Sequence, residues 1–222
     1  MNNPGFVFLA FSFFGLGAKT VDFDNVKLEM MPPYWTSTAT HAGPAPRWEV
    51  ESDKTAPSHQ KVFAQISKAG APFEIPLAIF DKVICRDGDL SVKFKIDAAQ
   101  GGKQSGSAGM VWRYQDPGNY YLLRFSADEK NIALFRMQNG QSHAIPVLGG
   151  RPGESTVYHD IRAEQWYVAK VSYRGSHFRV LFGNRILFEG VDDSIRNQGK
   201  TGLCTKAGTV AEFDDFRIDK KS

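Results

Sequence analysis

Three arginines recur at similar places in three consecutive predicted strands: Arg113, Arg124 and Arg136. Guanidinium groups pair bidentately with carboxylate, phosphate or sulfate oxygens, so three of them on one sheet face would suit a polar, negatively charged ligand. Because successive side chains of a strand point to opposite faces, the pattern predicts that the three share a face with Tyr120. Two lysines are added as further candidate cations. The complete candidate ligand-binding set is Arg113, Tyr120, Arg124, Arg136, Lys93 and Lys206.

Two other interpretations of the same arginines stay open at this point. Surface arginine is common, so the three side chains would simply be solvated on the outside of a sheet. Alternatively, Asp or Glu side chains from adjacent strands pair with them, which would make the arginines part of the scaffold.

The arginines lie in a segment, Ser107 to Val147, whose pattern predicts an antiparallel meander. Its strands are rich in β-branched and aromatic residues. Asp116-Pro117-Gly118-Asn119 has the composition of a turn, and Asn139-Gly140 is a strong hairpin signal. The predicted strands are 108–115, 120–126, 131–138 and 141–147.

The rest of the chain has the same rhythm of short strands and tight turns. Asp89 to Asp97 alternates strictly, with Leu90 and Phe94 predicted to face the core and Lys93 to face outward. The 222 residues include 21 glycines and 11 prolines, with no long helical period and no internal repeat. These features predict one all-β antiparallel sandwich domain over residues 19–222.

Composition excludes several classes of protein. The net charge of +3 is mild and gives no reason to expect a nucleic-acid partner. Two cysteines cannot form a disulfide-stapled scaffold or a four-cysteine zinc site. Cys85 and Cys204 could pair in an oxidising compartment, but the preferred interpretation is two buried free thiols.

Phe6 to Ala18 is an uncharged apolar run at the start of the chain. The run is shorter than the roughly 20 residues that span a bilayer, and its length suits a signal-peptide core. We therefore expect residues 1–18 to be a signal peptide, with a periplasmic or extracellular mature protein and no stable membrane insertion after its removal. The alternative is a buried first strand; the segment before the run carries no Lys or Arg.

Carboxylates near the two ends of the predicted domain are candidate metal ligands. Asp22 and Asp24 share a predicted strand face, and Asp214 lies in the last strand. Carboxylate oxygens suit Ca²⁺, so a structural calcium is one hypothesis. No compact loop of regularly spaced ligands is present, and solvated or capping aspartates are the preferred interpretation. No other cofactor is expected.

Aromatic residues in the first loops have two candidate roles. Tyr34, Trp35 and Trp48 could present flat surfaces to a sugar ring, but such residues more often close the end of a sandwich, which is the preferred interpretation.

Residue patterns of common hydrolytic sites are missing. No serine-nucleophile elbow, zinc-binding helix motif or phosphate-binding loop is present, and the five histidines are scattered singly. Paired carboxylates on one strand could serve as nucleophile and general acid in a glycosidase. The best match is Glu212-Phe213-Asp214-Asp215-Phe216-Arg217, where Arg217 occupies the place of the second glutamate. The sequence therefore does not predict a paired-carboxylate glucanase.

The segment from Ala108 to Tyr121 (AGMVWRYQDPGNYY) resembles a block found in many exported bacterial proteins. These proteins have the concanavalin A-like lectin/glucanase fold and are similar to laminin-G-like and 3-keto-disaccharide hydrolase domains. The resemblance continues through 131–140, 166–173 and 199–218, and it covers Thr20 to Ile218. One departure is Cys204, at a position that is usually Trp in these proteins.

The resemblance implies a two-sheet jelly-roll sandwich and a carbohydrate partner. Two functional hypotheses follow. The first is a noncatalytic module that binds a glycan, with an acidic one suited to the arginines, on a basic aromatic sheet face. The second is a carbohydrate-active hydrolase related to the 3-keto-disaccharide hydrolases, whose acid and base residues the sequence does not identify. The missing carboxylate pair favours the first.

Overall fold

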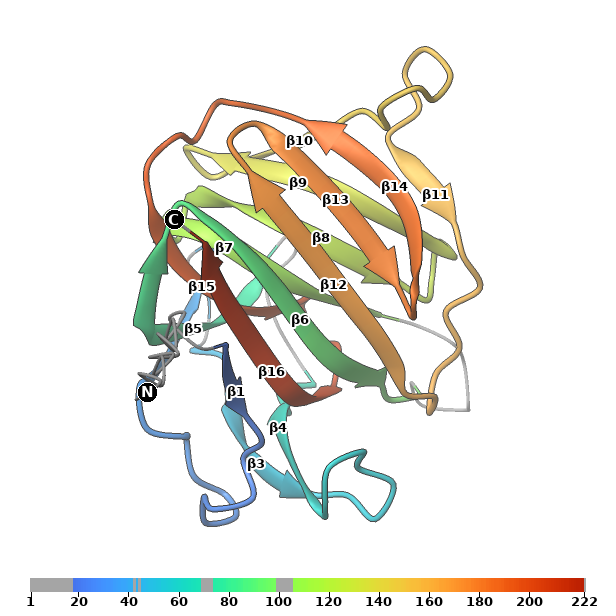
Figure 1. Ribbon diagram of the computed structural model, residues 1–222. Helices are drawn as coiled ribbons and strands as arrows, with labels where there is room; N and C mark the ends of the chain where they lie inside the picture. Colours follow the sequence, from blue (N-terminus) through green and yellow to red (C-terminus); the bar gives the residue numbers. More distant parts are fainter. Residues whose placement is uncertain (1–17, 42, 44, 69–73, 99–105, 222) are drawn as a thin grey trace, which may run out of the picture.

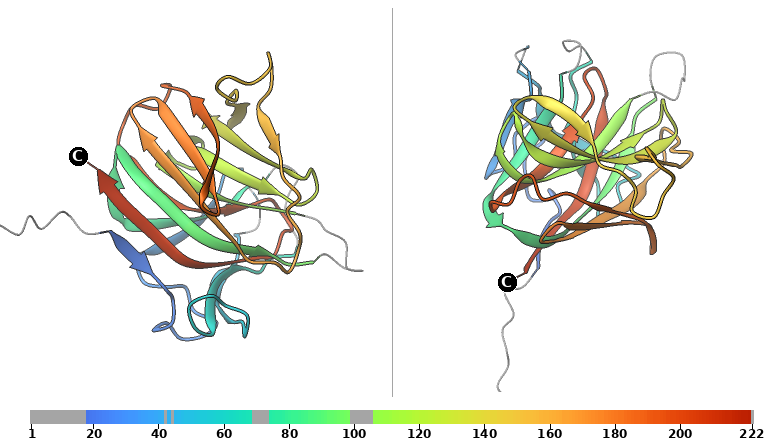
Figure 2. Two further views of the ribbon diagram at one scale, coloured as in Figure 1. Left: turned by 45° about the vertical axis from the view of Figure 1, so that its right-hand side comes forward. Right: turned by 90° about the horizontal axis from the view of Figure 1, so that it is seen from above.

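The computed structural model describes residues 18–41, 43, 45–68, 74–98 and 106–221. Over these residues the chain forms two antiparallel sheets of eight strands each, and the sheets lie face to face (Figures 1 and 2). The all-β, jelly-roll sandwich predicted from the sequence is confirmed. None of the described segments forms a helix of the length and apolarity needed to cross a membrane. The predicted signal peptide at 1–18 lies outside the described residues, apart from its last residue.

Sheet A, at the front of Figure 1, is built around β6 and β16. In spatial order its strands are β14 (Arg185–Val191), β13 (His177–Phe182), β12 (Tyr167–Arg174), β6 (Asp87–Ile96), β16 (Ala211–Lys221), β4 (Lys61–Gln65) and β3 (Trp48–Ser52), with β1 (Lys19–Val21) paired to β16.

Sheet B lies behind sheet A in the same view and contains the predicted meander. In spatial order its strands are β10 (Gln141–Ala144), β9 (Asn131–Gln138), β8 (Asn119–Ser126), β7 (Ser107–Asp116), β15 (Gly199–Thr205), β5 (Pro76–Cys85) and β2 (Trp35–Ala39), with β11 (Thr156–Tyr158) paired to β9. The four meander strands are confirmed, although β10 ends at Ala144 rather than at Val147.

The main hydrophobic core fills the space between the sheets. Leu90, Val92, Phe94 and Ile96 of β6 all belong to it, as their alternation predicts. Trp35 and Trp48 are buried in it and contact the ring of Phe63. Both tryptophans are therefore packed inside the sandwich and do not present a flat surface to a sugar.

Tyr34 differs from the two tryptophans. Its side chain is exposed, and the ammonium group of Lys82 lies 3.6 Å from the centre of its ring. Of the three aromatic residues considered as sugar-binding surfaces, Trp35 and Trp48 are therefore buried and Tyr34 is exposed.

A second hydrophobic cluster covers the face of sheet B that is turned away from sheet A, which we call the outer face. Leu77, Val111, Tyr120, Leu122, Met137 and Cys204 belong to this outer cluster. Their strand neighbours Leu123 and Leu203 belong to the core between the sheets. Because Leu77, Tyr120 and Met137 are buried, other segments of the chain cover part of this outer face.

The two cysteines are free and buried, as expected. Cys85 lies in the core between the sheets, where its sulfur is 3.1 Å from the hydroxyl oxygen of Tyr173, whereas Cys204 belongs to the outer cluster. Burial raises the pKa of the Cys204 thiol to about 12. Neither cysteine has the thiolate character that a reactive residue requires.

Candidate ligand-binding groove

A groove of about 830 Å³ lies on the outer face of sheet B. Strands β7, β8, β9 and β15 form its floor, and His41, Glu74 and Ile75 line it from the connections that precede β3 and β5. This volume lies in the range of about 300–1,000 Å³ that is usual for small-ligand sites.

Small residues lie beside Arg124 on both neighbouring strands. Arg124 lies opposite Gly109 on β7 and opposite Ala133 on β9. Gly109 in turn pairs with Cys204, whose sulfur lies only 2.7 Å from the place that a Cβ on Gly109 would take. Cys204 therefore occupies the space above a glycine.

Arg124 stands at the edge of the groove in a polar network. Its guanidinium group donates to both carboxylate oxygens of Glu129, at 3.1 and 2.6 Å, and to the side-chain oxygen of Asn131 at 3.0 Å. It also lies 5.0 Å from the centre of the Phe135 ring. Partial burial acts to raise the pKa of Glu129, but the hydrogen bonds from Asn131 and Arg124 outweigh it and hold the pKa below its ordinary value.

Lys206 also lines the groove, directly after β15. Its ammonium group lies 3.1 Å from a carboxylate oxygen of Asp128, whose other oxygen accepts a hydrogen bond from the Gly106 amide. Arg124 and Lys206 are thus the two members of the predicted cationic set that line the groove, and a carboxylate neighbours each of them.

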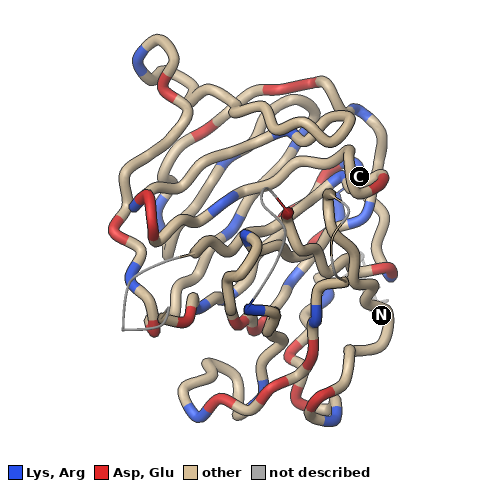
Figure 3. Tube along the Cα trace, turned by 180° about the vertical axis from the view of Figure 1, so that it is seen from behind, with Lys and Arg blue, Asp and Glu red and all other residues tan. Residues whose placement is uncertain are grey.

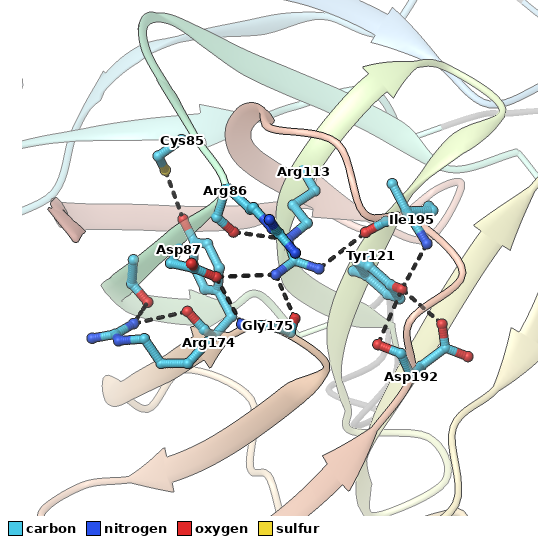
Figure 4. Close-up of polar contacts among 11 residues, drawn as sticks. Cys85, Arg86, Asp87, Arg113, Tyr121, Arg174, Gly175, Asp192 and Ile195 are labelled. Atoms are coloured by element: carbon cyan, nitrogen blue, oxygen red, sulfur yellow. Dashed lines mark hydrogen bonds and ion pairs between the residues drawn. The ribbon is translucent and has the colours of Figure 1, made fainter. Parts of the chain in front are cut away.

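Arg113 does not lie on the outer face, which corrects the expectation of a common face. The pairing of β7 with β8 shifts register between Trp112 and Asp116, and Arg113 has a positive φ of 49°. This bulge turns its side chain toward the space between the sheets, where it is 1% exposed. Its guanidinium group donates to the carbonyl oxygens of Arg86, Ile195 and Gly175 and approaches Asp87 (Figure 4).

Arg136 also lies on the inner face of sheet B. In the β8–β9 pairing it is opposite Tyr121, a core residue, whereas Arg124 is opposite Ala133. The guanidinium group of Arg136 lies 2.6 Å from both a carboxylate oxygen of Asp192 and the hydroxyl oxygen of Ser194. The prediction that the three arginines share one face is therefore wrong, and the alternative of internal pairing describes Arg113 and Arg136.

Tyr120 lies on the outer face as expected but is completely buried there. Its hydroxyl group is hydrogen-bonded to that of Thr40, in the connection after β2, and burial raises its pKa far above the ordinary value. It does not line the groove. Lys93 lies on sheet A, where it forms an ion pair of 2.6 Å with Asp215.

The candidate calcium ligands do not form a common site. Asp24 accepts hydrogen bonds from Ser58 and His59, and Asp214 accepts them from the Ser58 amide and hydroxyl. Asp22 accepts a hydrogen bond from the Asp24 amide. Within the part of the chain that the structure describes, no three His, Cys, Asp or Glu side chains are grouped so as to hold a metal ion. The structural calcium therefore stays a prediction.

Several groove residues were not singled out from the sequence. Leu122 follows from alternation, because it lies two residues from Arg124 on the same strand. Phe135 and Met137 share the face of Arg124 through the register of β8 with β9, which alternation alone does not give. His41 and Glu74 come from connections that approach the sheet only in the folded chain, so no sequence signal identifies them.

A charged cluster on sheet A contains the glutamate of the partial glucanase motif. The ammonium group of Lys95 lies 2.9 Å from Asp53 and 2.6 Å from Glu212. Burial raises the pKa of Glu212 to about 7 in spite of Lys95, whereas hydrogen bonds from Lys95 and Thr55 outweigh burial and lower that of Asp53. Glu212 is on the other sheet from the groove and cannot act on a ligand bound there.

The raised pKa of Glu212 predicts a pH-dependent contribution to stability. In the unfolded chain Glu212 loses its proton near its ordinary pKa of about 4.5, but in the folded chain it does so near 7. Its contribution to the free energy of unfolding therefore falls as pH rises from about 4.5 to about 7, and it is constant above that. Between pH 5 and pH 8, the free energy of unfolding of wild type should fall by about 2 kcal/mol more than that of Glu212→Gln.

Urea unfolding at the two pH values measures this difference. Glu129→Gln is the matched control, because the pKa of Glu129 is below its ordinary value and that residue stays ionised over the same range. Identical pH profiles for wild type and Glu212→Gln would contradict the prediction.

Comparisons with known proteins identify the fold. No protein-family model matches the chain, and no curated protein sequence does so. Among solved structures, a carbohydrate-binding module (CBM66) from Bacillus subtilis is similar with a TM-score of 0.61 and 16% identity, over 84% of this chain and 96% of that one. Lectin II from Ulex europaeus has a TM-score of 0.58 and 11% identity, over 90% and 97% of the two chains.

Enzymes share the same architecture. A β-1,3-1,4-glucanase derived from a mouse hindgut metagenome is similar with a TM-score of 0.54 and 10% identity, over 92% of this chain and 99% of that one. At such identities the likeness concerns the fold, which is the expected concanavalin A-like lectin/glucanase fold. Because this fold occurs in both lectins and glucanases, it does not determine the function, which depends on the residues of the groove.

Proposed function

We propose that this protein binds carbohydrate in the groove on the outer face of sheet B and does not hydrolyse it. The observation that carries the proposal is the network of Arg124, Glu129 and Asn131 beside the apolar floor of the groove. Sugar hydroxyl groups both donate and accept hydrogen bonds, and this network offers both donors and acceptors. The carbohydrate-binding module and the lectin with similar folds support the same partner class.

The pairing of the basic residues with carboxylates favours a ligand that has no net charge. Arg124 and Lys206 are both paired with carboxylates, and basic and acidic residues are interspersed in the view from the side of sheet B (Figure 3). A paired cation attracts an anion less than a free one, because its carboxylate partner offsets its field. We therefore expect neutral oligosaccharides to bind at least as well as acidic ones.

The absence of hydrolysis is proposed from the carboxylates of the groove. Among the described residues that line it, Glu74 is the one carboxylate, and it is 2% exposed. Glycoside hydrolysis by the common mechanisms needs two carboxyl groups about the scissile bond. Release of reducing sugar from a bound oligosaccharide would overturn this part of the proposal.

Arg124→Ala tests the site. Titration calorimetry with neutral and acidic oligosaccharides should show a loss of about 1–3 kcal/mol of binding free energy, the scale of a charge-assisted hydrogen bond. The melting temperature should change little, because the side chain is at the edge of the groove and partly exposed.

Arg179→Ala is the matched control for this experiment. Arg179 forms a comparable arginine–glutamate pair with Glu189 on sheet A, away from the groove. The control should bind like wild type. Equal losses for both variants, or no binding of any oligosaccharide to wild type, would refute the assignment of the groove.

A further inference from the structure

The lining of the groove changes character along the strands of sheet B. Lys206 and Arg124 lie toward one end. Two residues further along β8 comes Leu122, opposite Phe135, and Met137 follows two residues along β9. A strand advances about 3.4 Å per residue, so each step of two residues is about 7 Å.

The apolar end of the groove has apolar side chains on more than one side. Leu122 and Met137 are members of the outer cluster, and Phe135 and Ile75 pack against it. Cys204 lies in the row of Gly109 and Arg124, so its uncharged sulfur belongs to the other end of the floor.

Two polar side chains reach the apolar end of the groove, since Ser142 lies opposite Met137 and His41 approaches Gly140. A sugar hydroxyl placed directly on Leu122 or Phe135 would lose water without gaining a hydrogen bond from those side chains, which is unfavourable.

We propose that the ligand of the groove is amphipathic: a sugar linked to an apolar group, with the sugar at Arg124 and the apolar group over Leu122, Phe135 and Met137. This inference rests on the proposed carbohydrate-binding function and names the class of ligand. The distance from the row of Arg124 to the row of Met137, about 14 Å in four residues, accommodates one sugar ring and one substituent.

The apolar group has two chemical sources, an aryl or alkyl aglycone and an ester-linked acyl group. Both present uncharged carbon surface to the same residues, among which Phe135 is the partly exposed ring.

Paired probes test the inference in the wild-type protein. Titrations compare methyl glycosides of common hexoses with the 4-nitrophenyl glycosides of the same sugars, and with O-acetylated methyl glycosides. We expect at least a tenfold lower Kd for one substituted series, and the series that shows the gain identifies the source of the apolar group. Equal affinities for substituted and unsubstituted glycosides would overturn the inference and leave the carbohydrate-binding function standing.

Two variants locate the two halves of the ligand. Phe135→Ala should reduce the ratio between substituted and methyl glycosides toward one while changing the Kd of the methyl glycosides less than threefold. Arg124→Ala should weaken both series by a similar factor and leave the ratio unchanged. A changed ratio for Arg124→Ala together with an unchanged ratio for Phe135→Ala would overturn the proposed orientation of the ligand.

Two further outcomes separate this inference from the proposed function. If no glycoside of any series binds, the carbohydrate-binding function fails and the inference fails with it. If free 4-nitrophenol binds as tightly as its glycosides, the groove binds apolar molecules without recognising the sugar. This result would overturn both the carbohydrate-binding function and the amphipathic ligand. The wild-type comparison gives these answers even if a variant does not fold.

Discussion

Replacing Arg113 by Ala should lower the free energy of unfolding by about 3–5 kcal/mol, the range found when one partner of a buried charged group is removed. The side chain connects three separate segments, because its guanidinium group donates to carbonyl oxygens of Arg86, Gly175 and Ile195. These residues lie after β5, between β12 and β13, and between β14 and β15 (Figure 4). Ala would leave those carbonyl groups without their donors and a cavity beside the rings of Tyr121 and Phe178.

Urea unfolding of wild type and variant at one pH measures the loss. Arg179→Ala is the control, since its partner is on the surface, and it should cost less than about 1 kcal/mol. If Arg113→Ala does not fold, Arg113→Lys gives a second measurement, because an ammonium group cannot reach all three carbonyl groups from one position. A loss below about 1 kcal/mol for both variants would show that the buried network does not stabilise the fold.

The strands of the meander could be predicted because their signals are local. Asn139-Gly140 favours a tight hairpin turn, and β9 and β10 meet there with Gln138 opposite Gln141. The alternation in β6 is equally local and correctly separates its core side chains from Lys93. Such features depend on a few neighbouring residues and need no knowledge of the whole chain.

The faces of the three arginines could not be predicted from alternation alone. Alternation fixes the face of a residue relative to its own strand, but register relates one strand to the next. The turn after β8 places Arg124 opposite Ala133, so residues of β9 with odd numbers share its face and Arg136 does not. The bulge at Arg113 also interrupts the alternation of β7 and turns this side chain to the opposite face, and no residue type in the sequence indicates the bulge.

The complete lining of the groove could not be predicted from the strand pattern. Its floor is a regular sheet face, but His41 and Ile75 come from connections that are far from the meander in sequence. Tyr120 is removed from the groove by its contact with Thr40, 80 residues away along the chain. Burial of an outward-facing residue by a distant segment depends on tertiary packing, which strand pattern does not encode.

Replacing Gly202 by Ala should cost about 3 kcal/mol of stability, at the upper end of the usual range for overpacking. Gly202 lies in β15 between Val111 of β7 and Ile79 of β5, in the middle of sheet B. A Cβ built there would overlap the carbonyl oxygen of Ala78 and lie 3.0 Å from the Cα of Ile79. Both are backbone atoms, so relief requires β5 and β15 to move apart and weakens their hydrogen bonds.

Gly153→Ala separates this steric effect from the general cost of replacing glycine. Gly153 has a positive φ of 80°, and no described atom lies within 4 Å of the place that a Cβ would take, so Ala there incurs backbone strain alone, about 1–2 kcal/mol. Gly202 has no positive φ, and its cost comes from the contact with β5. Thermal or urea unfolding should therefore rank Gly202→Ala below Gly153→Ala in stability. The reverse order would mean that β5 can shift away from β15 at little cost, and that close packing in the middle of sheet B does not hold these two strands in place.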